Sequence, residues 1–125
     1  MPPRRRVPDA AGRAAITTWS ANPASAQAAD AAPTAVRWSL EELAQRHPGR
    51  SVEVRVPPYA AVQCIPGPVH RRGTPSNVVE TDPTTWLEVA TGKQTWDEAA
   101  GAGALRFSGT RADLTAFLPL VPQGD

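Results

Sequence analysis

Four stretches of the chain are predicted to be strands, and two of them, residues 51–56 and 104–108, alternate apolar with polar residues. The alternation is clearest over residues 51–56, where Val52, Val54 and Val56 are predicted to face a core while the residues between them face water. The Pro-Pro pair at 57–58 follows, so we expect this strand to end without a tight hairpin. Further strands are predicted over residues 59–65, 77–81 and 104–108.

Helical spacing of apolar residues dominates the N-terminal part. Asp9 is predicted to cap a helix that runs to about residue 21 and ends at Asn22-Pro23. One side of it carries Ala11 or Gly12, Ala15, Ile16 and Trp19. Residues 25–32 have few bulky apolar side chains and indicate a connector, although their alanines could extend a helix. A clearer helix is predicted over residues 33–47, with Val36, Leu40, Leu43 and Ala44 buried.

Helix boundary signals are dense after residue 81. Asp82 has the position of an N-cap and is followed by Pro83, and Gly92 supplies a stop for the helix between them. Thr95 and Glu98 have the spacing of a capping box and predict a second, short helix over residues 95–103.

The end of the chain predicts a last helix after the strand at 104–108 and the turn at Gly109. Thr110 and Asp113 are its candidate capping residues. Leu114, Phe117 and Leu118 would line one face before Pro119 ends it.

This order of helix, helix, strand and helix resembles the C-terminal half of a sterol carrier protein domain. The matching residues are Trp86-Leu87, Ala90-Thr91-Gly92-Lys93, Ala99-Ala100, Gly103-Ala104-Leu105, Gly109, Leu114 and Leu118. The resemblance extends from about residue 51 to residue 120 and is nearest to the small sterol-carrier-like proteins of actinobacteria.

The resemblance implies an α+β, two-layer domain. Its sheet would be short and mostly antiparallel, with roughly four or five strands, and helices would cover one face. Such domains hold a lipid in an apolar groove or tunnel between sheet and helices, and they have no catalytic motif that could be transferred to this chain. The larger sterol carrier domains have more sheet, so we expect a smaller enclosed volume here.

Length and composition predict one domain, because 125 residues are ordinary for a single core. We expect a flexible basic tail over residues 1–8 and a single domain over 9–125, with N-terminal helices over 9–47 and the sheet and C-terminal helices over 51–120. A net charge of +1 favours no nucleic-acid partner, and no apolar run is long enough for stable membrane insertion. One cysteine cannot form an internal disulfide, so a reducing, cytoplasmic location is expected.

A ligand-facing apolar wall is one interpretation of the large side chains in the C-terminal half. Its candidates are Trp86, Trp96, Leu105, Phe107, Leu114, Phe117 and Leu118. The alternative is that most of them simply pack against one another as a core. Trp96 begins a short helix, where a large ring is often half exposed, so it is the best candidate for a groove mouth.

Polar candidates are few. His70, Arg71 and Arg72 could bind an anionic head group, although a solvated loop is the more ordinary interpretation. Cys64 lies among apolar neighbours and is predicted to be buried and inert, since neither histidine is placed beside it. No residues have the spacing of metal ligands or of a phosphate loop, so we expect neither metal nor cofactor.

These observations favour a non-enzymatic carrier for a lipid or another apolar small molecule. The alternative is a protein-interaction or accessory domain that keeps the fold without a ligand cavity. An independent enzyme is the least favoured, because no convergent set of polar residues is present.

Overall fold

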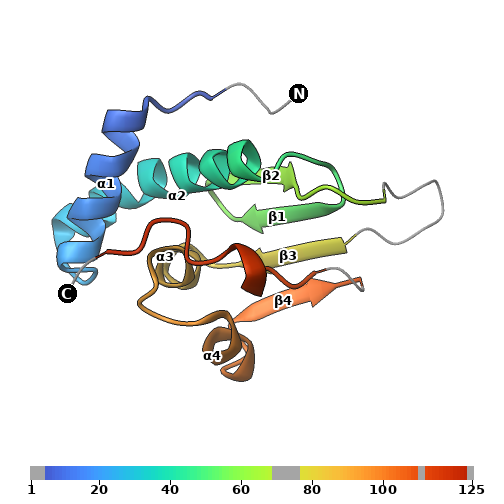
Figure 1. The fold of residues 1–125 in the computed structure, drawn as a ribbon. Helices are drawn as coiled ribbons and strands as arrows, with labels where there is room; N and C mark the ends of the chain where they lie inside the picture. Colours follow the sequence, from blue (N-terminus) through green and yellow to red (C-terminus); the bar gives the residue numbers. More distant parts are fainter. Residues whose placement is uncertain (1–4, 69–76, 110–111, 124–125) are drawn as a thin grey trace.

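The computed structural model describes residues 5–68, 77–109 and 112–123 as one α+β domain (Figure 1). Its order is α1 (Asp9–Ala21), α2 (Ala26–Arg46), β1 (Val52–Val56), β2 (Ala60–Cys64), β3 (Asn77–Thr81), α3 (Pro83–Thr91), α4 (Trp96–Gly101), β4 (Leu105–Ser108) and a 3-10 turn, η1 (Thr115–Phe117). The predicted fold class is confirmed: the described strands form one four-stranded mixed sheet.

The sheet has the strand order β2-β1-β3-β4. β1 pairs with β2 antiparallel and with β3 parallel, and β3 pairs with β4 antiparallel. β2 and β4 are therefore the two edges of the described sheet (Figure 1). The alternation predicted for residues 51–56 holds, since Val52, Val54 and Val56 are at most 1% exposed while Arg55 is exposed. The helices pack on this apolar face, and the charged residues of the strands lie on the other.

The prediction of no tight hairpin after β1 is wrong. Residues 57–59 alone connect β1 to β2, and the Tyr59 N–H donates to the Val56 carbonyl at 3.0 Å. The two prolines lack amide hydrogens, but Tyr59 has one, and that donor closes the turn.

Two expectations for the N-terminal helices need correction. Residues 26–32 belong to α2 and are not a connector, because the Ser25 hydroxyl caps the helix by accepting from the Ala28 N–H at 3.0 Å. Pro33 lies inside this helix. Asp9 does not cap α1 but is its first residue, and its carboxylate pairs with Arg13 at 2.9 Å.

The boundary signals of α3 and α4 are confirmed. The Asp82 carboxylate accepts from the Thr85 N–H at 2.8 Å, and Gly92 ends α3 with a left-handed φ of 85°. Thr95 and Glu98 form the expected reciprocal capping box at the start of α4.

The prediction of a last helix is wrong. Thr110 lies outside the described residues, and Asp113 accepts from the Thr115 N–H at 2.9 Å to begin only the short turn η1. Leu118 is already extended, because the ring of Pro119 disfavours helical backbone in the residue before it. The chain then crosses back to α3, where the Leu120 N–H donates to the Ala90 carbonyl at 2.9 Å.

Large side chains fill the space among the helices and between the helices and the sheet. Trp38, Trp86, Leu43, Leu87 and Leu114 are all fully buried. The Trp86 Nε1–H donates to the Ser39 hydroxyl at 2.8 Å, so the ring nitrogen of this buried side chain has a hydrogen-bond partner on α2.

Candidate functional site

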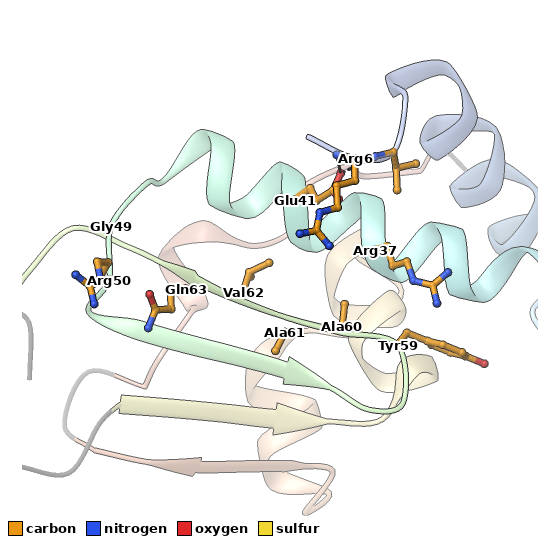
Figure 2. Close-up of a pocket in the computed structure, with 11 residues that line it drawn as sticks. Arg6, Arg37, Glu41, Gly49, Arg50, Tyr59, Ala60, Ala61, Val62 and Gln63 are labelled. Atoms are coloured by element: carbon orange, nitrogen blue, oxygen red, sulfur yellow. Dashed lines mark hydrogen bonds between the residues drawn. The ribbon is translucent and has the colours of Figure 1, made fainter. Parts of the chain in front are cut away.

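A groove of about 910 Å³ lies between α2 and the edge strand β2 (Figure 2). Among the described residues its lining comprises Arg6, Val7, Arg37, Glu41, Gly49, Arg50, Tyr59, Ala60, Ala61, Val62 and Gln63. Four of these, Ala60–Gln63, are consecutive in β2, so the strand forms the floor along its length. α2 forms one wall, and the N-terminal segment closes it from above.

Hydrogen bonds around the end of β2 hold the floor in place. The Ile65 N–H donates to the His47 carbonyl at 2.6 Å, which ties the strand to the end of α2. The Ser51 hydroxyl and N–H both donate to the Ile65 carbonyl, at 2.9 and 3.2 Å. The distance between α2 and β2 is therefore fixed at this end of the groove.

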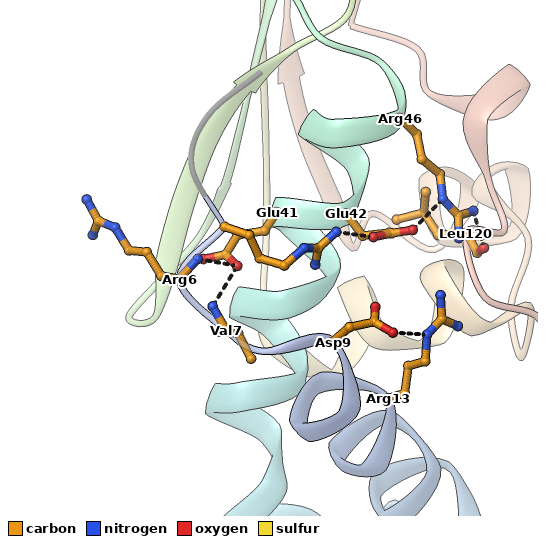
Figure 3. A network of polar contacts seen from close by, with 9 residues as sticks. Arg6, Val7, Asp9, Arg13, Glu41, Glu42, Arg46 and Leu120 are labelled. Atoms are coloured by element: carbon orange, nitrogen blue, oxygen red, sulfur yellow. Dashed lines mark hydrogen bonds and ion pairs between the residues drawn. The ribbon is translucent and has the colours of Figure 1, made fainter. Parts of the chain in front are cut away.

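Glu41 anchors the N-terminal segment over the groove. Its Oε1 accepts from the backbone N–H groups of Arg6 and Val7, at 3.1 and 3.0 Å (Figure 3). Glu41 accepts hydrogen bonds from the backbone of Arg6 and forms no ion pair with its guanidinium group. The charge of the Arg6 side chain is therefore not neutralised by Glu41.

Glu42, the next residue of α2, joins both ends of the described chain to that helix (Figure 3). Its carboxylate pairs with Arg5 and, at 2.7 Å, with Arg46, whose Nη1 donates to the Leu120 carbonyl at 2.6 Å. Burial alone would raise the pKa of Glu42, but the hydrogen bonds from Arg5 and Arg46 outweigh it and lower the pKa. The network therefore stabilises the fold at neutral pH and weakens as pH falls through that lowered pKa.

The positive charges of the groove have no carboxylate partner in the described structure. Arg5, Arg13, Arg46 and Arg55 all form ion pairs there. Arg6, Arg37 and Arg50, which line the groove, form none within the described ranges. The guanidinium of Arg37 lies 5.8 Å from the centre of the Tyr59 ring, which holds it beside one end of β2.

The predicted apolar wall lies elsewhere in the molecule. Trp86 and Leu114 are fully buried, and Trp96 and Leu105 are 7% and 8% exposed. Phe117 and Leu118 are half-buried beside the core. None of the seven predicted residues is among the described residues that line the groove, and their contact with a ligand stays a prediction.

Phe107 is the exposed member of that set, at 52%. It pairs with Val79 in the sheet, so it lies on the face that the helices pack against. Its ring stacks on Trp96 with 6.2 Å between ring centres. β4 is an edge strand, which explains why a side chain on the apolar face stays accessible.

The candidate anion-binding residues His70, Arg71 and Arg72 lie outside the described residues. No group of histidine, cysteine and acidic residues suited to a metal ion occurs among those that the structure describes. Within the same ranges, no helix has both the length and the apolar character needed to cross a bilayer.

Cys64 is fully buried on the apolar face of β2, and burial raises the pKa of its thiol to about 12. Since the thiolate is the reactive form, we expect native protein not to react with 5,5′-dithiobis(2-nitrobenzoic acid) at neutral pH. The same protein in guanidinium chloride should release one equivalent of coloured thiolate, in line with its single cysteine. Rapid labelling of the folded protein would contradict the burial of the Cys64 thiol.

Sequence reasoning missed the groove residues Arg37, Arg50, Tyr59 and Val62. Arg37 and Arg50 were indistinguishable from ordinary exposed cations, because which charges form ion pairs is a property of the fold. The sequence of β2 held no signal of its edge position, because the central strand β1 alternates apolar and polar residues more clearly than β2 does.

The sequence model of the bacterial SCP ortholog family matches residues 28–120. The match covers the described sheet, α2 from its third residue onward, α3 and α4, and it ends where the chain returns to α3. No curated protein matches the sequence.

Proposed function

The chain belongs to the bacterial SCP ortholog family, and we propose that it holds a lipid or another apolar small molecule, without catalysis, in the groove between α2 and β2. The family match confirms the resemblance to sterol carrier proteins. The ligand and its place in the groove are the proposal.

The observation that carries the proposal is a groove of ligand size between a helix and the sheet. Its volume of about 910 Å³ falls within the range of small-molecule sites. Val7, Tyr59, Ala60 and Val62 are half-buried and offer apolar surface there. Each methylene transferred from water onto such a surface would contribute up to about 0.8 kcal/mol, so a medium-length acyl chain has sufficient driving force.

The proposed role needs no reactive group. Cys64, the one nucleophilic thiol, is buried away from the groove lining and protonated at neutral pH. A single cysteine also suits the reducing, cytoplasmic compartment that we propose for the protein.

Uptake of the fluorescent fatty acid cis-parinaric acid tests this proposal. We expect saturable binding to the wild type and a loss of roughly tenfold or more in Val62→Glu, because an ionised carboxylate stays hydrated and removes apolar surface that the acyl chain would contact. Phe107→Glu is the matched control, since that side chain is exposed and outside the groove.

The two variants also separate the possible sites. Loss of uptake in Phe107→Glu with normal uptake in Val62→Glu would place the ligand at the predicted wall and overturn the groove assignment. A wild type that takes up no probe would overturn the carrier function itself.

A second candidate function is an interaction or accessory domain. The packing of Trp86 and Leu114 into a filled core supports it, because the space that a sterol would need between helices and sheet is occupied by side chains. A folded protein that takes up no fatty acid would favour this candidate.

A further inference from the structure

The outer edge of β2 is the feature that neither the family nor the proposed carrier role explains. β2 is the terminal strand of the described sheet, with β1 on one side only. An edge strand presents unpaired N–H and C=O groups, which natural proteins commonly cover or protect with charge. Here that edge forms the floor of a groove.

Hydrogen-bond alternation shows which residues present these groups. In an antiparallel pair, positions that exchange both backbone hydrogen bonds alternate with positions that exchange none. The Ser51 N–H donates to the Ile65 carbonyl, and continuing the register from there makes Ala61 and Gln63 the residues bonded to β1. The backbone groups of Ala60 and Val62 are therefore directed toward the open edge, into the groove.

The surroundings match the way an extended peptide is bound by strand addition. That mode needs an open strand edge and an adjacent wall with side-chain pockets. α2 runs beside β2 and provides the wall through Arg37 and Glu41 (Figure 2). Val62 lies on the floor and offers an apolar contact to alternate side chains of an added strand.

Charge identifies the kind of peptide. Arg50 lies beside Gln63 at one end of β2, and Arg37 lies beside Tyr59 at the other (Figure 2). Arg6 lies above them on the N-terminal segment, and none of the three arginines has a carboxylate partner in the described part of the chain. The whole protein carries a net charge of only +1, so three arginines against the single carboxylate of Glu41 in the described lining are a local excess of positive charge.

We propose that the groove is a docking site for an acidic, extended peptide segment of a partner protein, which adds to the sheet beside β2. Its backbone exchanges hydrogen bonds with Ala60 and Val62, and its carboxylates pair with Arg37 and Arg50. At about 3.4 Å per residue, the four residues Ala60–Gln63 match four or five residues of such a segment.

Fluorescence anisotropy tests the proposal with a fluorescein-labelled peptide of about six residues in which glutamate and valine alternate. We expect saturable binding that weakens with salt, as charge pairing at a surface requires. The double variant Arg37→Gln/Arg50→Gln should bind roughly tenfold more weakly. Arg106→Gln is the matched control and should bind like the wild type, because Arg106 is exposed, forms no described ion pair and lies on the opposite edge strand.

N-methylated peptides separate strand addition from simple charge attraction in the unaltered protein. Two peptides of the same charge are compared, each methylated on one alternate set of amides. An added strand directs only one set toward β2, so one peptide should lose binding and the other should keep it. Equal binding of both peptides, or an unchanged affinity in the double variant, would overturn the proposal. Since the readout is peptide anisotropy, the proposal can fail or succeed independently of fatty-acid uptake.

Discussion

Replacement of Trp86 by alanine is expected to lower the free energy of unfolding by about 3–5 kcal/mol, the range for deletion of a large aromatic side chain from a core. Trp86 is fully buried in α3 and lies between that helix and α2. Truncation would leave a cavity in a small domain whose total stability is on the order of 5–15 kcal/mol. The variant should therefore be close to unfolding at room temperature.

A lost hydrogen bond adds to the lost packing. The Trp86 Nε1–H donates to the Ser39 hydroxyl, which is itself fully buried. Ser39 still donates to the Ala35 carbonyl at 2.7 Å in the variant, so only part of its hydrogen bonding is lost. Trp86→Phe separates the two effects, because it keeps most of the ring and removes the donor, and it should cost only about 1–3 kcal/mol.

Urea denaturation followed by circular dichroism measures both variants, with Phe107→Ala as the control. Phe107 is 52% exposed, so its truncation should cost less than about 1 kcal/mol. The comparison also distinguishes the two interpretations of the predicted apolar wall. A ligand-facing Trp86 would give nearly normal stability with a large loss of fatty-acid uptake, and that outcome would contradict the core assignment.

The parts of the fold that could be predicted are those that short-range contacts determine. Asp82 and Thr85, and likewise Thr95 and Glu98, are three residues apart, so their spacing alone reveals their hydrogen bonds. The strand at residues 77–81 was also located correctly, because the Asp82 cap that follows it at once fixes where the strand ends.

The wrong predictions arose where two local signals indicated different structures for the same residues. Ser25 caps a helix through a hydroxyl, but the alanines that follow lack an apolar stripe and resemble a connector. Toward the C-terminus, Leu114, Phe117 and Leu118 have helical spacing, yet Pro119 forces Leu118 out of the helical region and leaves only a short turn.

The groove could not be predicted, because it is assembled from segments far apart in the sequence. Arg6, Arg37 and Val62 meet only because β2 is an edge strand beside α2. Strand order is set by long-range pairing, and β3 inserts between β1 and β4 without any local signal. The predicted ligand wall rests on size and apolarity, which identify core residues as readily as ligand contacts and give no indication of the groove.

Gly12→Ala is expected to destabilise the protein by about 1–3 kcal/mol or more, the cost of overpacking a core. Gly12 is a buried residue of α1 that faces α2. A Cβ at this position would overlap Trp38, lying 2.6 Å from its Cβ and closer still to Cγ and Cδ1. The position of the Trp38 Cβ is fixed by the backbone, so rotation of the side chain cannot relieve that overlap, and the two helices must separate.

The direction of this effect is informative because alanine is otherwise the better helix former, by about 1 kcal/mol. Gly101→Ala supplies the matched control: Gly101 lies in α4, and a Cβ there meets nothing within 4 Å. We expect this control to be neutral or stabilising by about 0.5–1 kcal/mol, so the two identical substitutions should shift the urea midpoint in opposite directions. A Gly12→Ala protein as stable as the wild type would mean that α1 and α2 do not pack as closely as the structure shows. The N-terminal segment that α1 supports over the groove would then lack its fixed position.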